Sequence, residues 1–390
     1  MRIALIGTRG VPAHYGGFET AVEEVGRRLV ARGHDVTVYC RRQPGESAAS
    51  AGDYLGMRLV HLPAMRRKSL ETLSHTGLSM LHLLRHGGAD AAIVFNAANA
   101  VFLPLLWVRR LPTATHVDGL EWRRAKWGPV GQRYYRLAEA LSVRWSDALI
   151  ADARGISDYY AEEFGADTAE IAYGAPLLES PGSDRLAELG LTPGTYHLVV
   201  ARFEPENHVD IAIEGYARSS ARHPLVVVGS APYPGAHQRR IDDLAGQHDG
   251  VRLLGGIWDQ EQLDQLYANA LTYVHGHSVG GTNPSLLRAM GAGTAVVAYD
   301  VNFNRDVLGP DGRFFADAAE LATRLDEAEA SPESAESAGD RLAERAGAVY
   351  TWDAVAEAYE TLCENLVGGR SQRGTHTGRR VRASAWRGER

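Results

Sequence analysis

Short apolar runs alternate with longer stretches of helical spacing through the first half of the chain. The runs predict strands at Ile3–Ile6, Val36–Cys40, Ala91–Phe95, Ala114–Val117, Ala148–Ala151 and Ala169–Tyr173. The stretches between them predict helices over residues 18–32, 70–86, 97–109, 130–146 and 153–164. Continuous apolar strands separated by helices indicate a parallel sheet that is covered on both faces.

The same pattern restarts after residues 174–194, a loop rich in Gly, Pro and Ser. The second series of predicted strands is His197–Ala201, Leu225–Val228, Arg252–Leu254, Thr272–His275 and Ala295–Ala298. Predicted helices cover residues 206–221, 236–247, 260–269, 284–291 and 317–328, and a last helix covers Trp352–Leu366. We therefore expect an α/β protein with two Rossmann-like, doubly wound parallel-sheet domains that face a central cleft, where α/β proteins bind ligands.

Length and composition agree with this division, because 390 residues at roughly 100–200 per domain suggest two domains. The chain is 45% hydrophobic and 23% charged, as in ordinary globular proteins. We expect an N-terminal domain over residues 1–180 and a second domain over 181–350. A helix over 351–367 should pack back on the first domain, and residues 368–390 should form a disordered basic tail.

The net charge of −7 is unevenly distributed. Residues 370–390 carry seven arginines against Glu389, residues 1–175 carry a small positive excess, and the part between them is strongly acidic. This distribution is not typical of a nucleic-acid-binding protein. The tail is either a solubilising end or a contact for an anionic membrane surface.

The sequence also gives an expectation for the compartment. The two cysteines, Cys40 and Cys363, are too few for a disulfide framework. The first strand begins at once, without the pattern of a signal peptide. We expect a cytoplasmic protein, with peripheral contact to the inner face of the membrane as the alternative.

A glycine-rich loop joins the first predicted strand to the first helix. It lacks the G-x-G-x-x-G dinucleotide pattern because residue 9 is Arg, and no acidic residue ends the second strand. A nicotinamide enzyme is therefore disfavoured, and no P-loop is present. Gly16 and Gly17 could offer backbone amides to an anion or a sugar hydroxyl. The alternative is that these glycines serve tight packing of strand and helix.

Two polar segments follow predicted strands at their carboxyl ends. His116 lies near the end of one predicted strand of the first domain, and Asp118 and Glu121 follow it, where a side chain could orient a hydroxyl or accept a proton. Arg202 follows the first strand of the second domain, where its guanidinium could pair with a diphosphate. A charged surface loop and a surface arginine are the respective alternatives.

The densest polar segment runs from His275 to Gly293. Within it, His277, Gly280, Gly281, Thr282 and Asn283 precede Pro284, a residue suited to the first turn of a helix, and Ser285 follows. Such a loop offers backbone N–H groups, hydroxyls and the positive end of a helix dipole. This environment suits a pyrophosphate.

Four segments in this order, GTRGVPAHYGGFET, VDGLEWRRAKW, ARFEPEN and HSVGGTNPSLLRAM, resemble a known family. The chain is similar to GT-B glycosyltransferases of family 4, in the subgroup with a rhamnosyltransferase-like N-terminal domain, over about residues 1–367. The resemblance implies retaining transfer of a sugar from a nucleotide-diphosphate donor to an acceptor hydroxyl, without a cofactor or an obligatory metal. The implied acceptor is a sugar, a lipid-linked molecule or a small molecule.

The resemblance also assigns residues. Asp118, Glu121 and Arg202 are its candidate catalytic residues, and the acceptor should lie against the first domain. The candidate donor-binding residues are Gly16, Gly17, Arg202, Asn207, His277, Gly280, Gly281, Thr282, Asn283, Ser285 and Arg288.

The chain departs from the family at three of these positions. The family places an Arg and a Lys on the diphosphate, whereas here Arg202 matches the Arg, and Glu206 and Asn207 stand near the Lys. The family's glutamate pair corresponds to Gly280 and Arg288. Arg288 either adds positive charge near the diphosphate or points to solvent and leaves ribose binding weaker. A GT-B epimerase and a catalytically impaired nucleotide-sugar-binding protein therefore remain as alternatives.

Overall fold

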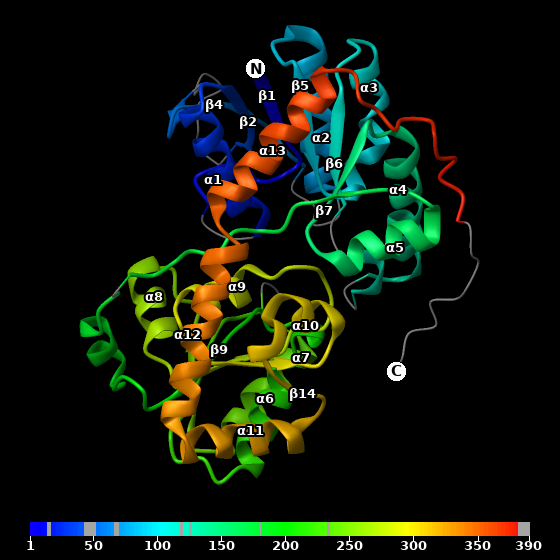
Figure 1. Ribbon diagram of the computed structural model, residues 1–390. Helices are drawn as coiled ribbons and strands as arrows, with labels where there is room; N and C mark the ends of the chain where they lie inside the picture. The colour runs from blue at the N-terminus through cyan, green and yellow to red at the C-terminus, as the bar shows by residue number, and fades with distance from the viewer. Residues whose placement is uncertain are drawn as a thin grey trace. The chain divides into compact units, whose positions relative to one another are not determined.

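The computed structural model describes residues 1–13, 17–42, 52–65, 70–117, 120–124, 127–179, 181–231 and 235–380. The chain forms two compact units (Figure 1). Unit 1 contains Met1–Tyr173 together with the C-terminal residues from Trp352, and unit 2 contains Gly174–Thr351. Among the described residues, no helix combines the length and the apolar character that crossing a membrane requires.

Unit 1 is built on an eight-stranded sheet with the order β3-β4-β2-β1-β5-β6-β7-β8. The strands are β1 (Arg2–Ile6), β2 (Asp35–Arg41), β3 (Asp53–Tyr54), β4 (Met57–Leu62), β5 (Ala91–Phe95), β6 (Thr113–His116), β7 (Ala148–Ala151) and β8 (Ala169–Glu170). All neighbours pair in parallel except β3 with β4, which are antiparallel. The expected parallel sheet is confirmed, and β3 and β4 extend it at the edge beyond β2.

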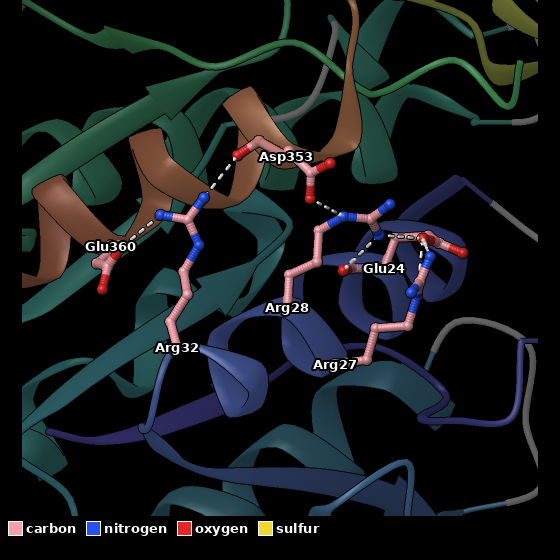
Figure 2. Close-up of polar contacts among 6 residues, drawn as sticks. All are labelled: Glu24, Arg27, Arg28, Arg32, Asp353 and Glu360. Atoms are coloured by element: carbon pink, nitrogen blue, oxygen red, sulfur yellow. Dashed lines mark hydrogen bonds and ion pairs between the residues drawn. The ribbon is translucent and has the colours of Figure 1, made fainter.

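Helices cover this sheet and connect its strands. They are α1 (Gly17–Ala31), α2 (Glu71–His86), α3 (Pro104–Trp107), α4 (Pro129–Trp145), α5 (Arg154–Phe164) and α13 (Trp352–Val367), with short 3₁₀ turns η1 (Ala97–Phe102) and η2 (Glu121–Arg123). The helix α13 packs against α1 within unit 1. Figure 2 shows the ion pairs along this contact, where Arg28 of α1 and Arg32, just after the end of α1, meet Asp353 and Glu360 of α13.

Unit 2 is built on a six-stranded, fully parallel sheet with the order β11-β10-β9-β12-β13-β14. Its strands are β9 (His197–Val200), β10 (Leu225–Val228), β11 (Val251–Gly255), β12 (Thr272–His275), β13 (Val296–Tyr299) and β14 (Arg313–Phe315). Its helices are α6 (Val209–Arg218), α7 (Ala236–Ala245), α8 (Gln260–Ala268), α9 (Pro284–Gly291), α10 (Asn302–Leu308), α11 (Ala318–Ala330) and α12 (Pro332–Val349), with 3₁₀ turns η3 (Asp184–Leu189), η4 (Pro205–Asn207) and η5 (Gly309–Asp311). The second predicted sheet is therefore confirmed.

The helix α12 was not predicted, because its buried face consists mainly of small residues. Ala335, Ala338, Gly339, Leu342 and Ala346 are buried along it. A Cβ atom at Gly339 would lie 2.0 Å from the carbonyl oxygen of Gly293, so the two backbones approach too closely for a side chain. This packing depends on missing side chains, which a search for large apolar residues cannot detect.

The C-terminal segment differs from the disordered tail expected from residue 368. Residues 371–380 lie against unit 1, where the Ser371 hydroxyl donates to Asp147 Oδ1 at 2.5 Å. Arg380 donates to Glu163 Oε2 at 2.6 Å and to Glu139 Oε2 at 2.8 Å. The order has a physical cause, since two buried carboxylates on α4 and α5 need a cation. The part of the prediction that concerns residues 381–390 lies outside the described residues.

Candidate active site

Two loops of unit 2 meet at the carboxyl ends of β9 and β12, which are neighbours in the sheet. The first loop, residues 201–208, contains Arg202, and the second, residues 276–283, precedes α9. The backbone N–H and the hydroxyl of Ser278 donate to the carbonyl of Glu206 at 2.9 and 3.1 Å. His208 Nδ1 donates to the carbonyl of Gly276 at 2.7 Å. These bonds bring the segment of Arg202 and the glycine-rich loop together, two of the sequence-predicted parts of the site.

Arg202 is half-buried, and its guanidinium forms no ion pair with a carboxylate among the described residues of the chain. Its backbone carbonyl accepts a hydrogen bond of 2.8 Å from the side-chain amide of Asn207. Asn207 therefore uses its amide to shape this loop, while the charge of Arg202 is available to an anion.

The loop before α9 presents donors at the positive end of a helix. Gly280 adopts a φ of +135°, which favours glycine, and no atom lies within 4 Å of where its Cβ would be. Asn283 caps α9, because its Oδ1 accepts from the N–H and the hydroxyl of Ser285 at 2.9 and 2.8 Å. Within the described part of the chain, the N–H groups of Gly280, Gly281 and Asn283 have no acceptor. Free N–H groups at a helix N-terminus bind anions, so this loop is suited to a phosphate. The side chain of Thr282, another candidate residue of the loop, is buried.

Two stacked histidines lie where β12 ends and this loop begins. The half-buried ring of His277 stacks on His275 with centroids 4.4 Å apart and planes 13° apart. Burial lowers the pKa of His275 to about 3, so this imidazole is neutral at physiological pH. The Asn304 amide donates to the His277 carbonyl at 3.0 Å, which ties α10 to the same loop.

Arg288 lies at the edge of this region and has a partner that sequence analysis did not predict. Its Nη1 forms an ion pair with Asp264 of α8, and both side chains are about four-fifths buried. The positive charge of Arg288 is thus balanced within unit 2. This geometry weighs against Arg288 as a free cation for the diphosphate.

In unit 1, two of the predicted residues, Gly16 and Asp118, lie outside the described residues. Gly17 is the first residue of α1. Glu121 is buried in η2, where its carboxylate pairs with Arg124 Nε at 2.7 Å and accepts from Trp127 Nε1 at 3.2 Å. These contacts favour a role in holding the loop over a role as proton acceptor.

An aromatic group that the candidate residues did not include surrounds His116 in unit 1. The His116 ring stacks on Phe95 and Tyr173, with centroids at 5.6 and 6.1 Å, and Phe18 meets it edge-on at 5.1 Å. Burial lowers the pKa of His116 to about 3, so the ring is neutral. The sequence held a signal for this group, because Phe95 ends a predicted strand, His116 lies near the end of another and Phe18 directly follows Gly17.

Glu206 stands near the position of the family's Lys, but it was not among the candidate donor-binding residues. Its Oε2 is buried and has no hydrogen-bond partner among the described residues, although it lies on the loop of Arg202. A buried carboxylate oxygen without a donor is costly unless something else supplies one. The duplicated acid in the segment EPEN was the available signal.

Comparisons with known proteins agree with this geometry. Residues 16–174 match the glycosyl transferase 4-like domain, and residues 189–345 match the glycosyl transferases group 1 domain. Among solved structures, a sucrose-phosphate synthase from Thermosynechococcus elongatus superposes with a TM-score of 0.80 at 23% identity, over 94% of this chain and 99% of that chain. Anabaena HepE in complex with UDP-glucose superposes with a TM-score of 0.71 at 16% identity, over 93% of this chain and 100% of that chain.

One curated relative is the GtfA subunit of the UDP-N-acetylglucosamine–peptide N-acetylglucosaminyltransferase of Streptococcus gordonii. It is 27% identical over 122 residues, which are 30% of this chain and 23% of that protein, so the chain covers about a quarter of its relative. The two domain matches together span most of both units, and both sheets are parallel apart from the β3–β4 pair. The chain therefore belongs to the family 4 glycosyltransferases, which have the GT-B fold.

Proposed function

We propose that this protein transfers a hexose, such as rhamnose, from a nucleoside-diphosphate donor to an acceptor hydroxyl, with retention at the anomeric carbon and without a metal. The observation that carries the proposal is the unpaired guanidinium of Arg202 beside the free N–H groups before α9. Both are donors without acceptors among the described residues. A diphosphate is the ligand that satisfies both at once.

The chemistry follows from where charge develops. As the sugar–phosphate bond breaks, negative charge accumulates on the leaving diphosphate, and Arg202 with the N–H groups of Gly280 and Gly281 stabilises it. His275 is neutral, so it adds no positive charge to this stabilisation. Glu206 Oε2, buried without a partner in the described part, is available as an acceptor for a hydroxyl of the donor sugar.

Unit 1 would take the acceptor. The aromatic group of Phe18, Phe95, His116 and Tyr173 lies where β5 and β6 end, next to the first turn of α1 at Gly17. Because the Glu121 carboxylate is occupied by Arg124 and Trp127, it is a poor general base. The leaving phosphate itself would then accept the proton of the acceptor hydroxyl, which is consistent with retention.

The first test is calorimetric titration of the full chain with UDP, GDP and TDP. UDP is the first choice because the Anabaena neighbour was solved with UDP-glucose. Arg202→Ala should weaken binding, whereas Arg222→Ala, an exposed arginine of the same unit, should not. A transfer assay with the matching nucleotide sugar follows. If no nucleoside diphosphate binds, or if Arg202→Ala binds as tightly as the parent, the proposal fails.

A further inference from the structure

The surface formed by residues 97–147 carries charge of one sign. Its three described carboxylates, Glu121, Glu139 and Asp147, are only 7%, 4% and 4% exposed. Its described arginines all reach solvent at least in part: Arg109, Arg110, Arg123, Arg124, Arg133, Arg136 and Arg144. Every described charge that this region presents to solvent is therefore positive.

Apolar side chains stand among these arginines. Val130 is 81% exposed, Val108 73% and Leu137 54%, the highest values for large apolar residues in the described part of unit 1. Along α4, Val130, Arg133, Leu137 and Arg144 follow one another at spacings that place them on one face of a helix. This face of α4 is thus both cationic and apolar.

The end of α3 lies beside the end of α4 and extends the same surface. Trp107 of α3 meets Trp145 of α4 edge-on, with ring centroids 5.8 Å apart. Val108, Arg109 and Arg110 follow Trp107 directly and are exposed. We define the α4 surface as the partly or fully exposed residues of 107–110, 121–124 and 127–144.

The C-terminal segment runs beside α4 within unit 1 (Figure 1), and its arginines add further cations to this surface. The N–H of Gly374 donates to the carbonyl of Arg144 at 3.2 Å, and the guanidinium of Arg373 lies over the Trp107 ring at 5.4 Å. Arg373 and Arg379 are exposed. The contacts of Arg380 with Glu139 and Glu163 fix the segment in place.

We propose that the α4 surface docks on a lipid bilayer that contains anionic phospholipids. Arginines attract the phosphate headgroups, and exposed aliphatic side chains between them can enter the interface, as in helices that lie on membranes. Trp107 and Trp127 are partly exposed, and tryptophan rings suit the interface between lipid headgroups and acyl chains. A nucleic acid would use the arginines but would leave Val108, Val130 and Leu137 exposed to water, so the bilayer fits better.

The surface also bears on the acceptor, and this step rests on the proposed function. The turn η2, in which Glu121 is buried, contributes the partly exposed Arg123 to the α4 surface. Docking would place this side of unit 1 at the headgroup layer. The acceptor class that fits is therefore a lipid-linked hydroxyl compound.

The test is sedimentation of the full chain with vesicles of phosphatidylcholine, with and without phosphatidylglycerol, in the absence of any nucleotide. The parent should bind the anionic vesicles, and binding should weaken as salt is raised. Arg133→Gln with Arg144→Gln should lower the partition coefficient roughly 30-fold, as expected for two surface cations. Val130→Ser with Leu137→Ser should lower it roughly tenfold through lost apolar burial.

The matched control is Arg222→Gln with Arg239→Gln, two exposed arginines of unit 2, which changes net charge equally and should bind as the parent does. Absence of binding by the parent, or equal loss in the control, overturns the proposal. The proposal is also overturned if the parent binds a single-stranded oligonucleotide more tightly than vesicles and if the Val130→Ser, Leu137→Ser double variant keeps that oligonucleotide affinity. Because no nucleotide is present, vesicle binding can succeed while nucleotide binding fails, and the reverse.

Discussion

Two arginines at different places in the molecule have opposite surroundings. In unit 1, Arg380 lies between α4 and α5, where Glu139, Glu163 and the Tyr159 hydroxyl all accept from its guanidinium. In unit 2, Arg202 at the end of β9 pairs with no carboxylate among the described residues. The residue types are the same, but only one charge is satisfied by the protein itself.

The difference separates stability from binding. An arginine that neutralises buried carboxylates contributes to folding, because its removal leaves uncompensated charge in the interior. An arginine that is held half-buried without an anion contributes little to folding but is ready for a ligand. Arg288, paired with Asp264 at the edge of the candidate site, falls between the two.

The largest effect is expected on stability at Arg380. Replacing it by Met should lower the free energy of unfolding by about 2–4 kcal/mol, because Glu139 and Glu163 lose their cation. Ending the chain at Gly369 removes the same contacts and should also lower the melting temperature. Thermal and urea unfolding measure both effects. The exposed Arg379→Met is the control, and a melting temperature equal to the parent's in Arg380→Met would contradict the pairing.

The second prediction concerns Arg202. Arg202→Ala should weaken nucleoside-diphosphate binding by about 1.5–3 kcal/mol, roughly 10- to 150-fold, through loss of charge-assisted hydrogen bonds. The unliganded melting temperature should stay near the parent's value, because the side chain has no partner to lose in the described part of the protein. Calorimetry and thermal unfolding check the two halves. Lost stability with unchanged affinity would reverse the comparison with Arg380.

The sequence predicted the features that local pattern controls. Apolar runs identified β1, β5 and β9, and the polar loops after β9 and β12 were placed at one edge of a sheet because parallel strands end together. It missed β4, which lies near the edge of the sheet. The carboxyl-terminal half of β4, Val60–Leu62, is only partly buried and therefore lacks the continuous apolar run of a central strand. The helix α12 was missed because its core face is made of small side chains.

The sequence could not reveal partners that are distant along the chain. Arg380 is 241 residues from Glu139, and Arg288 is 24 residues from Asp264. Nothing in the local pattern links such positions, so the tail was predicted to be disordered and Arg288 to be free. Asn207 and Asn283 were predicted to bind the donor, and the sequence did not reveal that their side chains make local bonds to the backbone.

The third prediction is a pH dependence at Glu139. Burial raises the pKa of the Glu139 carboxyl from 4.5 to about 7, even with Arg380 beside it. A group with a raised folded-state pKa contributes stability below its unfolded pKa and loses it as pH rises through the folded value. Relative to Glu139→Gln, the parent should therefore lose about 1–2 kcal/mol of unfolding free energy between pH 5 and pH 8. Urea unfolding at both pH values measures it, and a pH-independent difference would contradict the assignment.

The fourth prediction concerns the intermediate case, Arg288. Arg288→Leu should lower the free energy of unfolding by about 1 kcal/mol, because Asp264 loses its partner. The effect is small because water still reaches the Asp264 carboxylate in part. Arg288→Glu should lower it further by placing two carboxylates together, and Asp264→Asn should relieve that repulsion. Donor affinity in the Arg288→Glu, Asp264→Asn double variant then decides the role of the position. A gain would indicate an impaired ribose site in the parent, and a loss would indicate that the positive charge assists the diphosphate.

The smallest effects are expected where α1 meets α13 (Figure 2). Asp353, which pairs with Arg28, is 80% exposed, so solvent screens this pair and Asp353→Ala should change stability by less than about 0.5 kcal/mol. Glu360 is 20% exposed and accepts from Arg32 at 2.7 Å and contacts His34 Nε2 at 2.7 Å. Glu360→Ala should therefore cost more, about 0.5–1 kcal/mol. The two variants lie on one helix and remove the same charge, so urea unfolding of both compares an exposed ion pair with a more buried carboxylate that has two partners. Equal effects would mean that burial and a second partner add nothing measurable at Glu360, and solvent screening would then dominate the whole contact between α1 and α13.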